Sequence, residues 1–118
     1  MDKEVAILAL AALAQSTRLD AFRLIVEGEP DGLPAGEIAR RLAVPHNTLS
    51  THLAVLSRAG LISAERRRQS IIYRARLEQF REVASYLLRD CCGGHPEVCG
   101  PLVSDLTTRC SRKENVHG

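Results

Sequence analysis

The apolar positions of this chain recur at helical spacing over most of its length. The first stretch, residues 3 to about 14, is apolar on nearly every side. A small domain rarely encloses such a helix, so the stretch favours a helix at a dimer interface. A second helix is predicted from about residue 17 to 28, capped by Ser16 or Thr17. Its inner face is predicted to carry Leu19, Phe22, Ile25 and Val26.

Two shorter helices follow, separated by a tight turn at Ala43-Val44-Pro45. The first is predicted from about Ala35 to Leu42, and the second from the turn to about Ala59. The second has apolar positions on one face at spacings of four and three, which are Leu49, Leu53 and Leu56. Gly60 then supplies the positive φ that helix C-termini commonly need. Two helices joined by a short turn form a helix-turn-helix pattern, which occurs in DNA-binding proteins and also as plain packing.

A basic hairpin is predicted directly after the two helices. Residues 61–64 and 70–75 contain the branched and aromatic side chains that short strands favour. The connection between them, Glu65-Arg66-Arg67-Arg68-Gln69, is mostly charged and suits a tip that projects into solvent. Such a tip is either a solvated turn or a wing that grips DNA phosphates beside the groove. Its place directly after a helix-turn-helix favours the wing.

The last helix is predicted to begin near Leu77. One broad face of it is apolar and carries Leu77, Phe80, Val83, Ala84, Leu87 and Leu88. Extending this row reaches Cys91, after which Gly93-Gly94 is predicted to break the helix. Beyond Cys99 the sequence is polar, and we expect a short ordered piece followed by a loose tail.

The composition fits one small domain with a local basic patch. The chain has 118 residues and four aromatic side chains, so the core must be built from Leu, Ile, Val and Ala. A domain of this size buries a modest fraction of its surface, and oligomerisation would cover more. The net charge of +2 does not by itself indicate nucleic acid. However, the segment from Arg58 to Arg76 holds six arginines against Glu65 alone, whereas the segment from Glu27 to Glu37 is acidic.

The four cysteines raise the question of the cellular compartment. In a short chain they could form a secreted disulfide framework, which requires an export signal. The one candidate, Val5 to Ala14, is short and is preceded by the net-negative Asp2-Lys3-Glu4. No run is long enough to span a bilayer, so no membrane partner is expected. We therefore expect a cytoplasmic protein with reduced thiols.

Over about residues 5 to 90 the chain resembles the ArsR/SmtB family of metal-responsive repressors. The resemblance is carried by residues 13–19, 38–42, 49–56 and 59–62, and most specifically by Ser-x-His-Leu at 50–53 followed by Ala-Gly-Leu at 59–61. It implies a mainly α fold with a small β-hairpin, namely a homodimeric winged helix-turn-helix with the first and last helices at the interface. Residues 1–90 would form the DNA-binding and dimerisation domain. Residues 91–118 would form a cysteine-containing sensor segment and C-terminal tail.

The chain departs from the family pattern at three places. Ala43 stands where the turn often carries Gly, and Pro45 stands where the recognition helix often starts on Ser. Arsenic-sensing members place a cysteine pair on the first helix of the helix-turn-helix, but residues 35–39 of this chain contain no thiol. Some arsenic-responsive members resemble this chain in carrying adjacent cysteines after the last helix.

The resemblance implies a dimer that inserts two recognition helices into successive major grooves of double-stranded operator DNA. Candidate contacts on the recognition helix are Asn47, Thr48, Ser50, Thr51 and His52. His52 is equally open to a role in local packing. Candidate wing contacts are Arg66, Arg67, Arg68 and Gln69.

Three thiols, Cys91, Cys92 and Cys99, form the predicted sensor site. Thiolates are soft ligands, and trivalent arsenic or antimony prefers three sulfurs in a pyramid. Binding of As(III) or Sb(III) as inducer would pull the tail against the last helix and lower operator affinity. Gly93-Gly94 would let Cys99 fold back.

Other readings of the thiols stay open. Zinc would want a fourth ligand such as His95 or Cys110, and cadmium or lead would also suit sulfur. A thiol redox switch is a further alternative, and Cys91 could be a plain core residue. Catalysis is not expected, because the chain has no Cys-x-x-Cys pair and no evident phosphate cradle, and no organic cofactor is expected.

Overall fold

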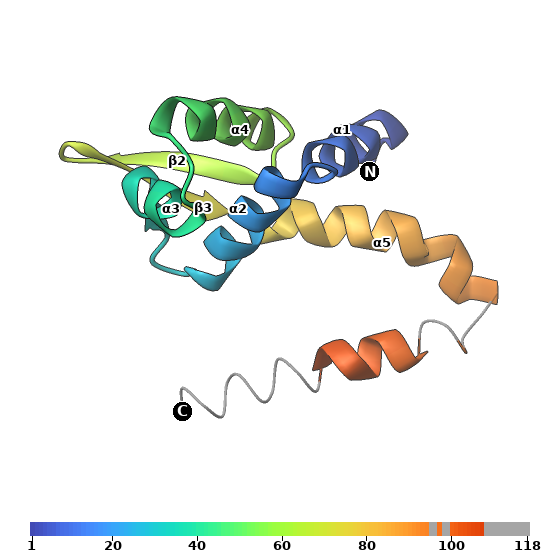
Figure 1. The fold of residues 1–118 in the computed structure, drawn as a ribbon. Coiled ribbons are helices and arrows are strands. Elements are labelled where there is room, and N and C mark those ends of the chain that lie inside the picture. The colour runs from blue at the N-terminus through green and yellow to red at the C-terminus, as the bar shows by residue number, and fades with distance from the viewer. Residues whose placement is uncertain (95–96, 98–99, 108–118) are drawn as a thin grey trace. The chain divides into compact units, whose positions relative to one another are not determined.

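The computed structural model describes residues 1–94, 97 and 100–107 (Figure 1). Its elements are α1 (Lys3–Leu13), α2 (Ser16–Glu27), β1 (Leu33–Pro34), α3 (Ala35–Leu42), α4 (His46–Arg58), β2 (Ile62–Arg67), β3 (Ser70–Ala75) and α5 (Leu77–Gly94). The predicted order of helices and hairpin is confirmed. The contacts divide the chain into two compact units, Met1–Val83 and Ala84–Gly118. In the second unit α5 continues to Gly94, and residues 100–107 are helical, as expected for a short ordered piece.

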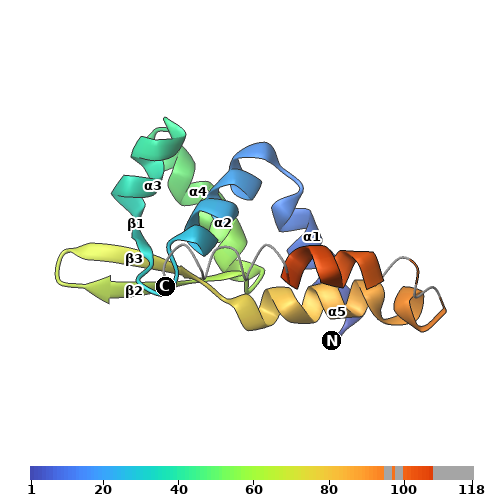
Figure 2. The same cartoon turned by 90° about the horizontal axis from the view of Figure 1, so that it is seen from below.

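Helix α2 is the centre of the first unit, where it packs against α1, α3, α4 and β3 (Figures 1 and 2). The core is aliphatic apart from Phe22, as the composition requires. Its fully buried large side chains are Ile25, Ile38, Leu49, Leu53, Leu56, Leu61 and Ile62. The inner face predicted for α4 is therefore confirmed.

Two details of α2 differ from the prediction. The helix begins at Ser16, and the side chain of Gln15 caps it by accepting a hydrogen bond from the backbone N–H of Arg18 at 2.9 Å. Neither Ser16 nor Thr17 is the cap, because both already lie inside the helix. Leu19 was predicted to face inward, but 43% of it is exposed. The buried positions of α2 are Ala21, Phe22 and Ile25.

The sheet has three antiparallel strands in the order β1-β3-β2. The short strand β1, which pairs Leu33 with Tyr73, was not predicted. Strand β2 runs through Arg67, so the prediction that residues 65–67 form the connection is wrong. Residues 65–67 belong to the strand because the pairing with β3 continues as far as Arg67 and Ser70. The turn therefore consists of Arg68 and Gln69 alone, and Arg68 has φ 56°. The hairpin extends beyond the helices of this unit in Figures 1 and 2.

Helices α3 and α4 end in the same way. Ala43 follows α3 with φ 54° and ψ 47°, and the N–H of Val44 donates to the carbonyl oxygen of Ala39. After α4 and its C-cap Ala59, Gly60 has φ 78°, and the N–H of Leu61 donates to the carbonyl oxygen of Leu56. Both are left-handed caps that satisfy carbonyls at the helix end. Ala43 thus adopts a left-handed conformation that glycine adopts more readily.

Helix α1 leaves much of its apolar surface exposed. Only its alanines at 6, 9 and 12 are buried, whereas Val5, Ile7, Leu8 and Leu10 are 38–54% exposed. On α5, Leu77 and Phe80 are 46% and 41% exposed. The predicted break at Gly93-Gly94 comes slightly later, since α5 includes both glycines. Among the described residues no single helix is long and apolar enough to cross a membrane; α1 and α2 reach that length and composition only as a pair bent by 99°.

Candidate nucleic-acid interface

The outer face of α4 carries four of the five residues of this helix that were predicted to contact DNA. Asn47, Thr48, Ser50 and Thr51 are all exposed. Two of their polar groups are engaged within the helix, because Asn47 Oδ1 accepts from the N–H of Thr48 and the Thr51 hydroxyl donates to the carbonyl of Asn47. Leu49, Leu53 and Leu56 fix the opposite face in the core. The polar side chains are therefore presented from a rigid support.

His52 differs from these four, because it is only half-buried and points toward α2. Its Nδ1 lies 3.4 Å from Nη1 of Arg18, whose Nε donates to the carbonyl oxygen of Ala12 at 2.6 Å. This geometry favours the packing alternative for His52. Arg18 belongs to the stretch that carries the family resemblance, but its contact with a residue 34 positions away is not visible in a linear pattern.

His46, which was not predicted as a site residue, is exposed at the first position of α4. It lines a hollow of about 270 Å³ between α3, α4 and the hairpin, together with Gly36, Gln69 and Ser70. Gln69, a predicted wing residue, thus lies beside the start of the recognition helix. A basic or polar residue directly after the proline that opens a recognition helix is the sequence signal that could have indicated His46.

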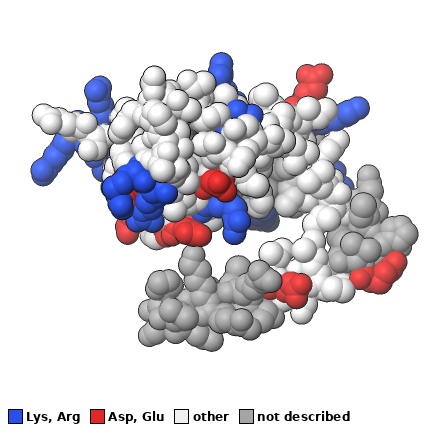
Figure 3. Space-filling view, viewed as in Figure 1, with Lys and Arg blue, Asp and Glu red and all other residues white. Residues whose placement is uncertain are grey.

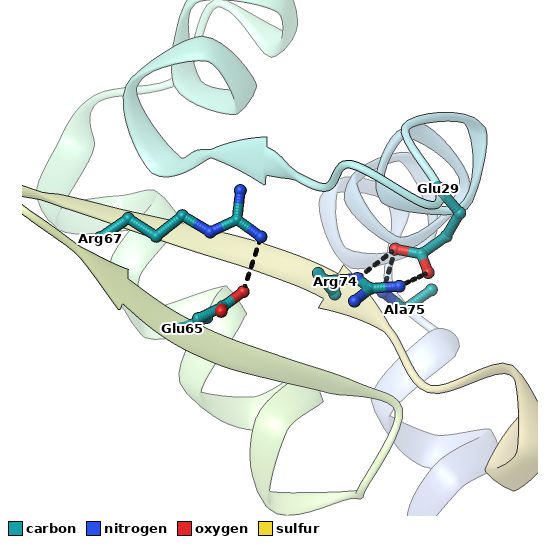
Figure 4. A network of polar contacts seen from close by, with 5 residues as sticks. All are labelled: Glu29, Glu65, Arg67, Arg74 and Ala75. Atoms are coloured by element: carbon teal, nitrogen blue, oxygen red, sulfur yellow. Dashed lines mark hydrogen bonds and ion pairs between the residues drawn. The ribbon is translucent and has the colours of Figure 1, made fainter.

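The arginines of the hairpin face different ways. Side chains alternate along a strand, so Glu65 and Arg67 share one face of β2 and Arg66 lies on the other. Arg67 Nη2 donates to Glu65 at 2.9 Å (Figure 4), whereas Arg68 lies in the turn. Figure 3 shows Lys and Arg side chains protruding at this end of the molecule, and others elsewhere on the same face. The predicted wing residues are therefore exposed together at one tip.

The base of the hairpin is tied to the rest of the unit by Glu29. Its carboxylate accepts from Arg74 Nη2 at 3.0 Å and Nε at 3.3 Å, and from the N–H of Ala75 at 3.3 Å (Figure 4). The hydrogen bond to Glu29 raises the pKa of Arg74 above its usual value. Because the Glu29 side chain is only 15% exposed, this bridge anchors β3 to the loop after α2.

A second carboxylate holds two arginines on α3. Glu37 accepts from Arg40 at 2.6 Å and from Arg41 at 2.7 Å. The hydrogen bonds from Arg40 and then Arg41 lower the pKa of Glu37 to about 2. The basic surface next to the turn is thus partly neutralised, as Arg67 of the hairpin is by Glu65.

The predicted thiol site falls largely outside the part of the chain that is described. Cys91 and Cys92 lie on the last turn of α5 as backbone positions, and Cys99, His95 and Cys110 lie outside the described residues. Within the described side chains no three His, Cys, Asp or Glu residues gather in a way that could hold a metal ion. The sensor assignment stays a prediction.

Known proteins are similar to this chain in sequence and in fold. Residues 13–63 match the family described as a helix-turn-helix domain. The transcriptional activator HlyU of Vibrio cholerae serotype O1 is 30% identical over 87 residues, which cover 74% of this chain and 78% of HlyU. The structure of reduced HlyU from Vibrio cholerae N16961 matches 75% of this chain and 90% of its own length, with 29% identity and a TM-score of 0.59.

Two further solved structures share the fold at lower identity. An ArsR-like transcriptional regulator from Rhodococcus has 23% identity and a TM-score of 0.69, over 82% of this chain and 89% of that one. The homodimeric winged helix-turn-helix domain Mb0332 from Mycobacterium bovis has 24% identity and a TM-score of 0.61, over 80% and 83%. The winged helix-turn-helix fold predicted from the sequence is confirmed.

Proposed function

The chain belongs to the ArsR/SmtB family of winged helix-turn-helix transcription regulators, and from that premise we propose that it is a repressor released from operator DNA by a thiol-bound metalloid. The observation that carries the DNA-binding part is the outer face of α4. Exposed Asn47, Thr48, Ser50 and Thr51 stand on a helix whose other face is locked in the core. Such a helix fits the major groove, while the hairpin arginines reach phosphates.

The proposed repressor acts as a homodimer. The exposed apolar side chains of α1, from Val5 to Leu10, support this, since a second copy would remove them from water. The Mycobacterium bovis neighbour is described as homodimeric. In a dimer the two recognition helices would meet half-sites about one turn of DNA apart.

The inducer in this proposal is arsenite or antimonite, held by Cys91, Cys92 and Cys99. Three thiolates within nine residues supply the donor set that a trivalent metalloid takes. Linkage requires that operator DNA weaken metalloid binding by the same factor as metalloid weakens operator binding, typically about 5–150-fold.

A thiol redox switch is the second candidate. It is favoured by the relative HlyU, one of whose structures is described as the reduced form. In this version oxidation of the same cysteines, rather than metalloid binding, lowers operator affinity.

The decisive experiment titrates the operator complex with arsenite, antimonite, zinc, cadmium and peroxide in parallel, followed by fluorescence anisotropy. The operator is first selected from random duplexes. We expect arsenite and antimonite to release DNA at the lowest concentrations, Cys92→Ser to abolish release, and Cys110→Ser, the matched control, to preserve it. Release that persists in Cys92→Ser contradicts the site. Release by peroxide that a reductant reverses supports the redox switch instead.

The wing is tested by its salt dependence. Arg66→Ala with Arg67→Ala is expected to weaken operator binding and to reduce the slope of log K against log salt by about 0.9 for each lost phosphate contact. Arg23→Ala with Arg76→Ala removes the same charge from exposed positions away from the tip and should leave the slope unchanged. Equal slopes for both pairs contradict the wing.

A further inference from the structure

The side chain of Arg18 on α2 contacts both α1 and α4. It lies on the first turn of α2, donates from Nε to the carbonyl oxygen of Ala12 at 2.6 Å, and places Nη1 3.4 Å from Nδ1 of His52 on α4. Ala12 is on the last turn of α1, where carbonyls lack a partner within the helix. Arg18 and His52 are both half-buried, so these contacts are partly shielded from water.

The contact with Arg18 determines which nitrogen of His52 carries the proton. A guanidinium has five N–H donors and no acceptor, so Nδ1 must be the acceptor. The neutral imidazole then carries its proton on Nε2. The ring is held in one tautomer and one orientation by a partner that stays charged.

The spacing along α4 places His52 at the inner edge of the helix. Positions 49, 52, 53 and 56 follow the i, i+3, i+4, i+7 pattern of one face, and the leucines of this set are 0–1% exposed. His52 is thus a polar member of the stripe that seats α4. Ser50 and Thr51 lie on the opposite, exposed side.

We propose that Arg18 and His52 are positioning residues for DNA binding: their contact fixes how α4 is rotated against α2, and His52 does not itself read a base. This inference rests on the proposed function, because it concerns the same recognition helix. A small rotation of α4 would move the hydroxyls of Ser50 and Thr51 relative to base edges. Arg18 also links α4 to the end of α1, the helix proposed for dimerisation, so a displaced α1 would act on the recognition helix through this side chain.

Two amide substitutions separate positioning from base contact. In Asn the amide oxygen Oδ1 is bonded to Cγ, as Nδ1 is in His. The Asn side chain of His52→Asn can therefore still accept a hydrogen bond from Arg18. The amide of Gln reaches the place of Nε2, so His52→Gln keeps a group for DNA but loses the acceptor at the Nδ1 position. Gln has a higher helix propensity than Asn. Helix propensity alone would therefore favour His52→Gln, which is the opposite of the result expected from the contact with Arg18.

Operator affinity is measured for wild type, His52→Asn, His52→Gln and His52→Ala. We expect Asn to bind as wild type, and Gln and Ala to bind roughly three- to tenfold more weakly, the range for one lost hydrogen bond. Adding Arg18→Ala to His52→Ala should cost less than the product of the two single losses. Three results would each overturn the inference. The first is full binding by His52→Gln with weaker binding by His52→Asn, and the second is equal binding by all four proteins. The third is a loss in the double variant that equals the product of the two single losses.

The DNA-free protein supplies an independent readout. Nitrogen-15 NMR of the His52 ring should show a proton on Nε2 and a bare Nδ1, and this preference should weaken in Arg18→Lys, which keeps the charge but loses the planar fork. A protonated Nδ1 in the wild type overturns the inference. Thermal unfolding of each variant identifies any that do not fold, and the NMR result on the wild type then decides. If the wild type binds no DNA duplex, the proposed function is contradicted. The NMR measurement of the ring tautomer still tests the contact between His52 and Arg18 in that case.

Discussion

The two faces of α4 differ in what their side chains do. On the inner face Leu49, Leu53 and Leu56 are 0–1% exposed and belong to the core, while on the outer face Ser50 and Thr51 are exposed. These positions interleave along about two turns of one helix. From this comparison we expect the free energy of unfolding and the affinity for DNA to depend on different residues of the same element.

Truncation of the inner face should have the largest effect. Leu53→Ala is expected to lower the free energy of unfolding by about 2–5 kcal/mol, because it removes buried methyl groups and leaves a cavity. Chemical denaturation measures this. Leu19→Ala on α2 is the matched control, since 43% of Leu19 is exposed and it should lose clearly less. Similar losses in both variants would break the distinction between buried and exposed positions.

Removal of hydroxyls from the outer face should affect DNA binding alone. Ser50→Ala and Thr51→Val are expected to change the free energy of unfolding by no more than about 0.5 kcal/mol, as surface substitutions do. Operator affinity should fall by about 1–3 kcal/mol for each lost base contact. Anisotropy titration and denaturation on the same samples compare the two. Variants that lose stability but keep affinity would reverse the assignment of the faces.

The caps that end α3 and α4 test whether the inner face is the only source of stability. Ala43 and Gly60 both have positive φ, which costs a residue with a Cβ about 1–2 kcal/mol. Ala43→Gly should therefore raise the free energy of unfolding by about 0.5–1 kcal/mol, and Gly60→Ala should lower it by about 1 kcal/mol. A Cβ at Gly60 would meet the Gln79 side chain at 3.5 Å, an ordinary contact, so backbone strain is the cause. If Ala43→Gly and Gly60→Ala shift the denaturation curve of the wild type in the same direction, the shared cap geometry is contradicted.

The smallest effect is expected at Glu37, on the exposed side of α3. Its pKa is lowered from 4.5 to about 2 in the folded protein, so its ion pairs with Arg40 and Arg41 contribute stability above pH 4.5. That contribution is lost as the pH falls from 4.5 toward 2. Glu37→Gln should flatten this part of the stability profile, and the two profiles should converge near pH 2. Denaturation between pH 2 and 7 measures it, with the exposed Glu82→Gln as control; an unchanged profile would show that the pairs add nothing.

Much of the inner face could be predicted from the sequence, because burial repeats with the period of the helix. Leu49, Leu53 and Leu56 follow that period, and Ile38 does so on α3. The hairpin was predictable from its strands, and its exposed arginines from the absence of an apolar stripe beside them. The DNA-contact candidates on α4 came from the family resemblance, which identifies this helix as the recognition helix.

The misses have a common physical cause, which is that they depend on partners distant in sequence. Strand β1 has two residues and exists through its pairing with β3. Strand β2 continues through Arg67 because the ladder with β3 continues, although every side chain of β2 after Ile62 is exposed and the strand shows no alternation. The role of His52 does not follow from its neighbours in the sequence, because its partner, Arg18, lies on another helix.

The contacts of Arg18 also bear on the order in which the chain folds during synthesis. Its bond to Ala12 closes a loop of six residues, whereas its contact with His52 spans 34. Loop-closure entropy makes the longer contact about 1.5 kcal/mol costlier to form, and on the ribosome it must also wait for α4 to emerge. The corner between α1 and α2 is therefore expected to form first and to present Arg18 in place, so that the nascent recognition helix docks against a guanidinium that is already oriented.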